Sequence, residues 1–327
     1  MNRVKYICFT AARMLTLLIG VCIISFILVS ASPVDPLESY IGPESTMSEE
    51  ARAEVEEYWG LNDPPVERFI KWADNTLHGD LGRSITYDMP VSQVIFSRFW
   101  YSLALILTAW ILSGVLGFAA GILAALRRGS IVDRGIKAVC LVFQSAPVFW
   151  FGLLMLTVFS SILGWFPMGQ AAPVDKLAED VTLWDRIYHL ILPAVTISIL
   201  GISKITLYTR QKATEIMNSD YILFARARGE SERQLVIRHC LRNISIPAVT
   251  VQFASFSELF GGIALAETVF SYPGLGSAIT DAAMNADAPL LMGIAMFSAV
   301  FVFVGNLTAN ILYAVIDPRL KEGGYRA

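Results

Sequence analysis

The chain has 327 residues, a formal net charge of −3 at pH 7, 55% hydrophobic and 16% charged residues, and a mean hydropathy of +0.56. A water-soluble domain cannot bury that apolar fraction, so the composition excludes a soluble globular protein and indicates an integral membrane protein. The four cysteines lie in apolar segments or in a basic loop. We therefore expect no disulfide in the two long polar loops and no cysteine-based metal site.

Six apolar segments are each long enough to cross about 30 Å of hydrocarbon. We expect transmembrane helices at residues 14–34, 99–126, 138–163, 187–208, 244–267 and 288–316. The first segment also resembles the apolar part of a signal peptide, but it is longer than such parts usually are. The predicted fold class is therefore an all-α membrane protein with six transmembrane helices.

Three features inside these segments carry further expectations. Ser113, Gly117 and Gly121 recur every four residues, which predicts close packing of one helix against another. Pro147 predicts a kink in the third span. Lys204 lies near the expected end of the fourth span, so its side chain is predicted to reach toward the membrane interface.

The polar segment 35–98 contains thirteen acidic residues and is predicted to form a small helical cap. Helix-start signals precede residues 46–58 and a second segment that begins at Pro64-Pro65. The second segment carries apolar residues on one face, namely Val66, Phe69, Ile70 and Ala73. The residues Gly79-Asp80-Leu81-Gly82 predict a turn.

Lysine and arginine are distributed unevenly along the chain. Eighteen of the 25 lie in the N-terminus, the short loop after the second span, the segment 204–242 and the C-terminal tail, and seven lie in the other loops. The positive-inside rule places the eighteen, and both termini, in the cytoplasm. The predicted parts are the N-terminus with the first span (1–34), an extracytoplasmic cap (35–98), a core of five spans (99–316) with a cytoplasmic loop (209–243), and a cytoplasmic tail (317–327).

Between the fourth and fifth spans lies a polar stretch with five arginines, residues 219–242, which we call the knob. Ser219 or Asp220 is expected to cap a first short helix, and Gly229 to end it in a left-handed conformation. Ser231 then opens a second helix through a capping box. A plain connection between two spans needs no such helices, so we expect a partner to dock on the knob.

The sequence contains no phosphate-binding loop, zinc-protease motif, Cys-x-x-Cys pair or nucleophile elbow, and its three histidines are far apart. We therefore predict no catalytic residue and no metal site. Glu258 is a carboxylate inside the fifth span, which makes it a candidate for a translocation path; a structural hydrogen-bond partner or a neutral acid explains it equally well. Glu267 lies nearer the outer interface and is expected to be solvated or to cap the next turn.

The knob resembles the cytoplasmic "EAA" loop of binding-protein-dependent ABC importer permeases. That pattern has an alanine-rich helix, a glycine, nine further residues and then I-x-L-P. Here residues 225–229, Ala-Arg-Ala-Arg-Gly, supply the helix and the glycine, and Leu241 matches, whereas His239 and Arg242 depart from the pattern. The stretch R-H-x-L-R-N at residues 238–243 resembles one branch, the first membrane subunit of dipeptide, oligopeptide and nickel permeases.

Other segments, in the same order along the chain, resemble that branch. They are Gly-Asp-Leu-Gly at 79–82 with Ser84 and Pro90-Val91, Pro147 with Phe149-Trp150, Glu-Thr-Val-Phe at 267–270 with Pro-Gly-Leu-Gly at 273–276, and Asp-Pro-Arg at 317–319. The resemblance covers nearly the whole chain, and several separated matches make it specific.

The resemblance implies a permease that forms half of a pore with a second, related permease in a bacterial or archaeal inner membrane. Two cytoplasmic ATPases would bind ATP and Mg, and an extracytoplasmic solute-binding protein would deliver cargo; the chain itself would hold no cofactor. The implied ATPase-coupling residues are Ala225, Arg226, Ala227, Arg228 and Gly229, and the candidate outer gate is Glu267, Pro273 and Gly274. Besides these proteins the chain contacts the lipid bilayer, and its arginines predict topology rather than nucleic-acid binding.

Peptides are the expected cargo, with nickel or another metal chelate as the alternative. A proton-coupled secondary transporter that uses Glu258 is a different class of function, but the sequence shows no inverted repeat. A membrane enzyme or scaffold is a third class, and no motif supports it. Co-purification of an ATPase separates the importer from the other two.

Overall fold

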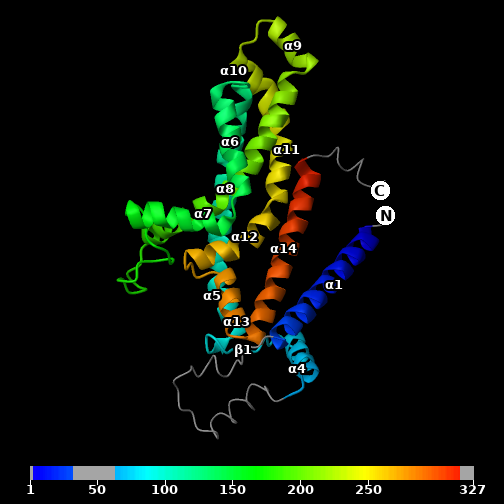
Figure 1. The fold of residues 1–327 in the computed structure, drawn as a ribbon. Coiled ribbons are helices and arrows are strands. Elements are labelled where there is room, and N and C mark those ends of the chain that lie inside the picture. The colour runs from blue at the N-terminus through cyan, green and yellow to red at the C-terminus, as the bar shows by residue number, and fades with distance from the viewer. Residues whose placement is uncertain (1–2, 32–62, 317–327) are drawn as a thin grey trace. The chain divides into compact units, whose positions relative to one another are not determined.

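The computed structural model describes residues 3–31 and 63–316, and these residues are mostly helical (Figure 1). The helix expected at 46–58 and the tail 317–327 lie outside the described residues. The chain forms two compact units, one from Met1–Ser102 and Pro273–Phe303 and the other from Leu103–Tyr272 and Val304–Ala327. Helices α5 (Val91–Leu126) and α14 (Ala288–Ile316) contribute to both units.

The first unit contains α1 (Arg3–Ser30), α4 (Pro65–Leu77) and a short antiparallel hairpin of β1 (Arg83–Ser84) and β2 (Met89–Pro90). The prolines start α4 as predicted, because a proline at the first helical position loses no intrahelical hydrogen bond. On its apolar face Phe69 lies 5.2 Å from the ring of Phe26 in α1, whereas Val66 and Ile70 are exposed. The apolar face is therefore only partly covered by α1.

The turn predicted at residues 79–82 is confirmed. Gly79 and Gly82 have φ of 90° and 85°, a left-handed region that costs glycine little. The backbone N–H of Gly82 donates to Oδ1 of Asp80 at 2.8 Å. The turn leads the chain from α4 into the hairpin.

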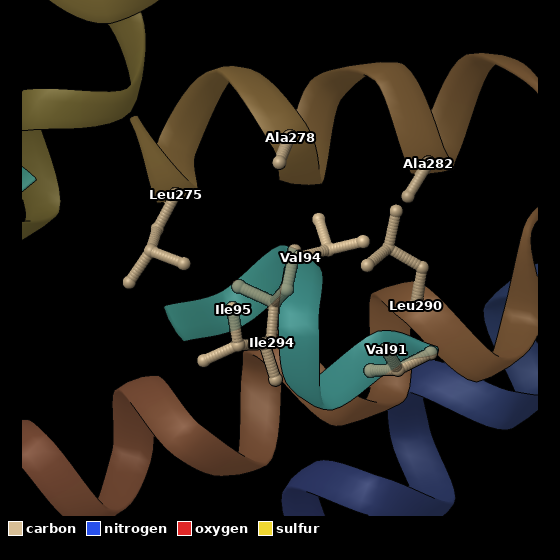
Figure 2. Close-up of a cluster of buried hydrophobic side chains, with 8 residues drawn as sticks. All are labelled: Val91, Val94, Ile95, Leu275, Ala278, Ala282, Leu290 and Ile294. Carbon is tan, nitrogen blue, oxygen red and sulfur yellow. The ribbon is translucent and has the colours of Figure 1, made fainter. Parts of the chain in front are cut away.

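The core of the first unit is a cluster of eight buried side chains from the start of α5, α13 (Leu275–Met284) and the start of α14 (Figure 2). They are Val91, Val94, Ile95, Leu275, Ala278, Ala282, Leu290 and Ile294. Helix α13 lies between the last two predicted spans, where the sequence had predicted no helix. Residues 275–282 carry small and branched side chains on one face. The segment is helical because burial of that face stabilises the helix.

Tyr87, in the hairpin, is fixed by two neighbours of opposite charge. Its hydroxyl donates to Oδ2 of Asp281 at 2.5 Å, and the guanidinium of Arg98 lies 4.9 Å from its ring centre. Burial, followed by the hydrogen bond to the carboxylate, raises the pKa of Tyr87 to about 12. The phenol therefore remains a neutral donor at any physiological pH.

A buried carboxylate also ties the hairpin to the start of α14. Asp287 is fully buried, and its Oδ2 accepts from the Ser84 hydroxyl at 2.6 Å and from the Thr86 N–H at 2.9 Å. Its Oδ1 accepts from the N–H of Leu290 at 3.1 Å, as expected of a residue that caps a helix. One side chain therefore satisfies three donors from two elements.

Replacing Asp287 by alanine is expected to lower stability by about 2 kcal/mol, because buried donors lose their acceptor. Asp63→Ala is the matched control, since Asp63 pairs with Lys71 at 2.8 Å on the surface, where such pairs contribute little. Thermal unfolding of the detergent-solubilised protein measures both changes. Equal midpoints for the two variants would contradict the role of Asp287.

The second unit contains the remaining helices. They are α6 (Ile131–Ser145), α7 (Val148–Met155), the π-helix η1 (Leu156–Ile162), α8 (Leu183–Met217), α9 (Asp220–Ala227), α10 (Glu232–Leu235), the π-helix η2 (Val236–Cys240), α11 (Leu241–Ala254) and α12 (Phe256–Val269). Thr182 and Asp185 form a capping box at the start of α8. In Figure 1, α9 and α10 lie beyond the ends of α8 and α11.

Three helices of the described residues are long and apolar enough to cross a membrane, namely α5, α8 and residues 288–308 of α14. The third span was expected as one kinked helix. It is instead broken, with a bend of 110° between α6 and the helical segment that follows it. Ala146 is extended (φ −87°, ψ 133°) because the residue before a proline avoids the helical region. Pro147 then begins a new helix, so the pair is either a broken span or a re-entrant segment.

The stripe of small residues on α5 packs closely against α8, as predicted. A Cβ placed on Gly117 would lie 3.0 Å from the carbonyl oxygen of Ile202. The hydroxyl of Thr206 donates to the carbonyl oxygen of Gly117 at 3.2 Å. At Ser113 the contact is with α11, where Nε2 of Gln252 donates to the serine hydroxyl at 3.3 Å. The glycines therefore allow the helix backbones to approach.

Candidate functional site

The knob has the helix–turn–helix form predicted for it. Helix α9 is followed by Gly229, whose φ of 87° lies in the left-handed region and whose N–H donates to the Arg226 carbonyl at 3.0 Å. At the start of α10, Oε1 of Gln234 accepts from the Ser231 N–H at 2.8 Å, and the Ser231 hydroxyl accepts from the Gln234 N–H at 3.4 Å. The turn and the capping box are both confirmed.

The cap predicted for the first knob helix is wrong in one respect. Ser219 occupies the N-cap position of α9, but its side chain accepts no hydrogen bond from the helix. Its hydroxyl donates instead to the carbonyl oxygen of Ile216 in the last turn of α8, at 2.6 Å. That carbonyl lies at the end of α8, where helix carbonyls need outside donors. Ser219 therefore caps the preceding helix.

The knob has a small apolar core that fastens it to the ends of three longer helices. Ile222 and Leu235 are fully buried, and Ala225 is 5% exposed. They pack with residues of α5, α8, η2 and α11, namely Ala125, Ala213, Cys240 and Ile244. The knob is therefore packed against the ends of these helices through one shared core.

Polar and ring contacts around His239 connect the second half of the knob to Tyr221 in α9. Oε2 of Glu230 lies 3.0 Å from Nε2 of His239, and the ring of Tyr221 lies 6.5 Å from the histidine ring. Nδ2 of Asn243 donates to the His239 carbonyl at 2.8 Å and to the Tyr221 hydroxyl at 3.3 Å. His239, where the general pattern has isoleucine, thus connects the two ends of the knob. Nothing in the linear sequence identified Glu230 as its partner.

The predicted coupling residues divide between the knob core and its surface. Arg226, Ala227, Arg228 and Gly229 are exposed, whereas Ala225 faces the core. The knob surface also carries four large apolar side chains that were not among the predicted residues: Tyr221, Leu223, Phe224 and Ile237, exposed by 46%, 51%, 66% and 54%. Large exposed apolar side chains on a polar segment make these four residues candidates for a contact with a partner. Their presence in a polar segment was the signal that could have identified them.

A buried ion pair supports the knob from the side of α8. Nη2 of Arg210 donates to Oδ2 of Asp133 at 2.8 Å, and Nε donates to the other carboxylate oxygen. Oδ2 also accepts from the N–H of Gly129 at 2.9 Å. Asp133 is 1% exposed, and its partner side chain is 19% exposed. The pair joins the first turn of α6 to the part of α8 that leads to the knob.

The comparisons with known proteins agree on one family. Residues 117–322 match the family described as binding-protein-dependent transport system inner membrane component. The oligopeptide transport system permease protein AppB of Bacillus subtilis (strain 168) is 38% identical to the chain, covering 93% of it and 95% of AppB. The chain belongs to this family. It is thus an inner membrane permease component.

Further relatives have similar extent. The di/tripeptide transport system permease protein DppB of Pseudomonas aeruginosa (strain UCBPP-PA14) is 34% identical over 95% of the permease and 98% of DppB. The dipeptide transport system permease protein DppB of Escherichia coli (strain K12) is 31% identical over 93% and 95%. A solved inward-facing structure of the MetNI methionine ABC transporter is 17% identical, with a TM-score of 0.56 over 69% of the permease and 97% of that chain. That likeness shows the fold.

The remaining predicted residues lie in different parts of the permease. Glu258 lies in the first turn of α12, three residues after Ser255, which separates α11 from α12. Its side chain lies outside the described part of the structure. Glu267 is fully buried near the end of α12, so the expectation that it is solvated is wrong. Pro273 and Gly274 belong to the other unit, where Gly274 precedes α13 in an extended conformation.

Proposed function

We propose that the permease forms half of the pore of an ATP-driven importer of di- or oligopeptides. The observation that carries this proposal is the near full-length identity to permeases named for dipeptides, di/tripeptides and oligopeptides. A second, related permease completes the pore, and an extracytoplasmic binding protein delivers the peptide. Two cytoplasmic ATPases bind ATP and Mg and drive the cycle, and this chain hydrolyses nothing.

The proposed topology keeps six membrane crossings with both termini in the cytoplasm. The crossings are α1, α5, the bent pair of α6 and α7, α8, the pair of α11 and α12, and α14. The concentration of lysine and arginine at the knob and the termini supports this orientation. Residues 35–98 then form an acidic extracytoplasmic cap that meets the binding protein.

The knob is the proposed contact with an ATPase. Its exposed apolar side chains, with Phe224 the most exposed, supply an interface core, and the exposed Arg226 and Arg228 supply charge at the rim. Because its own core is shared with α5, α8 and α11, a movement of the ATPase reaches the pore helices through it.

Replacing Gly229 by valine tests the coupling role. A Cβ on Gly229 would have no neighbour within 4 Å, so the substitution acts through backbone strain at φ 87° and not through a clash. We expect peptide uptake by the reconstituted complex to fall about tenfold, while membrane insertion is unchanged. The reason is that about 1–3 kcal/mol of backbone strain at this position changes the shape of the docking surface.

Gly135→Val is the matched control, because Gly135 lies in α6 with open space around it and no left-handed φ. A pull-down from the native membrane in mild detergent accompanies the uptake assay. The wild-type permease is expected to bring a second permease and ATPases, and the Gly229 variant fewer ATPases. A wild-type permease that comes out alone would instead support a secondary transporter, and uptake of a nickel chelate but no peptide would change the cargo.

A further inference from the structure

An apolar groove lies inside the first unit, between the last turns of α1 and the start of α4 (Figure 1). It has a volume of about 360 Å³, within the range of about 300–1,000 Å³ in which proteins bind small ligands. Its walls come from α1 through Ile23, Phe26 and Ile27, and from α4 through Pro65, Val66 and Phe69. Side chains of this kind suit a hydrocarbon chain and not a polar solute.

The groove is continuous with an apolar surface of α1. Residues Ala12–Leu28 form an apolar helix, and large side chains are exposed along its length. They are Leu15, Leu17, Ile19, Ile23, Ile24, Ile27 and Leu28. In an inner membrane permease such side chains contact lipid acyl chains, which are as apolar as leucine. Since Ile23 and Ile27 belong to both surfaces, an acyl chain reaches the groove without leaving the bilayer.

Helix α4 has the character of a helix that lies at a membrane surface. Val66 and Ile70, four residues apart, are apolar and exposed. Glu67 and Lys71 follow each of them and form an exposed ion pair at 3.3 Å. An amphipathic helix of this kind lies along the interface, with its apolar side among the acyl chains. The groove therefore opens at the level of the lipid headgroups.

Arg68 supplies a positive charge beside the groove. Its guanidinium carbon lies 6.0 Å from the ring centre of Phe26, which lines the groove. Its Nε is buried and has no hydrogen-bond partner in the part of the chain that the structure describes. The neighbouring Lys71, by contrast, is neutralised by Asp63 at 2.8 Å and by Glu67. A guanidinium in this position is suited to bind a phosphate group.

The same side of α4 carries two further polar atoms in the same condition. Nε1 of Trp72 and Oγ1 of Thr76 are buried, and they also have no hydrogen-bond partner among residues 3–31 and 63–316. With Arg68 they are spaced four residues apart, so the three lie on one side of the helix. The indole and guanidinium N–H groups only donate, and buried donors are rarely left without an acceptor. A phospholipid headgroup has phosphate and ester oxygens that accept.

We propose that the groove between α1 and α4 binds one phospholipid, with an acyl chain between the two helices and the phosphate beside Arg68. The acyl chain gains from burial against apolar side chains, and the phosphate from a charge-assisted hydrogen bond. This site is independent of the cargo and of the importer function proposed above. The bound lipid joins α1, in the bilayer, to α4, which leads into the hairpin of the first unit.

A helix of another subunit is the competing occupant of the groove. Such a helix covers the apolar walls as well as an acyl chain does. Its apolar surface, however, offers no anion to Arg68, whereas a phospholipid carries hydrocarbon and negative charge in one molecule. Charge complementarity therefore favours the lipid.

The test is photo-crosslinking of the complete complex in proteoliposomes. The probe is phosphatidylglycerol with a diazirine on one acyl chain, close to the ester, and peptide mass spectrometry locates the label. In the wild type we expect residues 65–69 to be labelled more strongly than residues 15–19, which report contact with bulk lipid. Ile27→Trp fills the groove and should remove most of the label from residues 65–69. Ile24→Trp is the matched control, because Ile24 is 60% exposed and Ile27 58%, but Ile24 does not line the groove.

A second comparison isolates the headgroup. Arg68→Gln should lower labelling of residues 65–69 about fivefold, the value of one hydrogen bond at a partly exposed site, and Arg68→Lys should keep most of it. Diacylglycerol with the same photoactivatable chain lacks the phosphate, so its weaker labelling should not change in Arg68→Gln. Arg83→Gln is the control, because Arg83 pairs with Asp88 at 2.9 Å on the surface of the same unit. Inorganic phosphate in excess should leave the labelling unchanged.

Each outcome supports or overturns the lipid site. Labelling of residues 65–69 no stronger than that of residues 15–19, or unchanged in Ile27→Trp, would overturn it and leave the groove to another subunit. An equal loss for phosphatidylglycerol and diacylglycerol in Arg68→Gln, or displacement by inorganic phosphate, would overturn the binding of a lipid phosphate by Arg68. Strong labelling that falls in Ile27→Trp, and for phosphatidylglycerol alone in Arg68→Gln, supports the site. Peptide uptake by the wild-type complex is measured separately, so failure of one proposal leaves the other intact.

Discussion

Replacing Gly121 by leucine is expected to prevent the permease from accumulating as folded protein. A Cβ at this position would lie 2.6 Å from Cβ of Thr209 and 2.8 Å from the carbonyl oxygen of Thr206. Both atoms belong to the body of α8, so neither can move without the helix. Overpacking typically costs about 1–3 kcal/mol where side chains can adjust, and more where backbone must move. Fluorescence-detected size-exclusion chromatography of the membrane extract measures the folded fraction.

The control for this substitution is Gly20→Leu in α1, where an added Cβ would meet nothing within 4 Å. Gly117→Ala is a variant of intermediate effect, because its Cβ would overlap less with α8, at 2.9 Å from Cβ of Ile205. We expect normal yield for the Gly20 variant, reduced yield for the Gly117 variant and little folded protein for the Gly121 variant. Equal yields for the Gly20 and Gly121 variants would contradict the close approach of α5 and α8.

The two glycines also show how far the sequence could predict the packing. A repeat of small residues every four positions places them on one helix face, and this holds for any helix. The repeat predicted a close contact, and the contact exists. It could not predict that α8 is the partner, because Thr206 is far away in the sequence and nothing local marks it. Helix pairing is decided by the whole fold.

The helix ends show the same division between local and distant causes. Gly229 and the Ser231 capping box were predicted correctly because both depend on neighbouring residues alone. The bend at Pro147 was predicted in position but not in size, since a proline permits anything from a kink to a complete break. Helix α13 was missed because its short apolar face gains stability only from burial against α5 and α14.

In the knob, the coupling residues predicted from the family resemblance are only partly exposed on the surface. Ala225 belongs to the core because it lies three residues after the buried Ile222, on the same side of α9. Phe224 lies on the opposite side and is 66% exposed. A helical projection of α9 predicts this division once one buried position is known. The pattern of the family, read residue by residue, does not contain that information.

Replacing Asp133 by alanine is expected to destabilise the permease by about 3 kcal/mol, the lower part of the range for a broken buried ion pair. The lower part applies because the Arg210 side chain is 19% exposed and regains some water. The variant leaves the guanidinium without its carboxylate and the Gly129 N–H without an acceptor. The midpoint of thermal unfolding in detergent measures the loss. Asp63→Ala, at an exposed pair, again serves as the control.

A double variant shows what the pair contributes beyond stability. In Asp133→Ala/Arg210→Met no unpaired charge remains, and burying apolar groups in its place is often neutral or stabilising, so most of the lost stability should return. Peptide uptake should nevertheless stay low, because the pair joins the first turn of α6 to the part of α8 that leads to the knob. Recovery of both stability and uptake would mean that the pair only fills space. Recovery of stability alone would show that an ATPase acting on the knob needs this connection to move the pore helices.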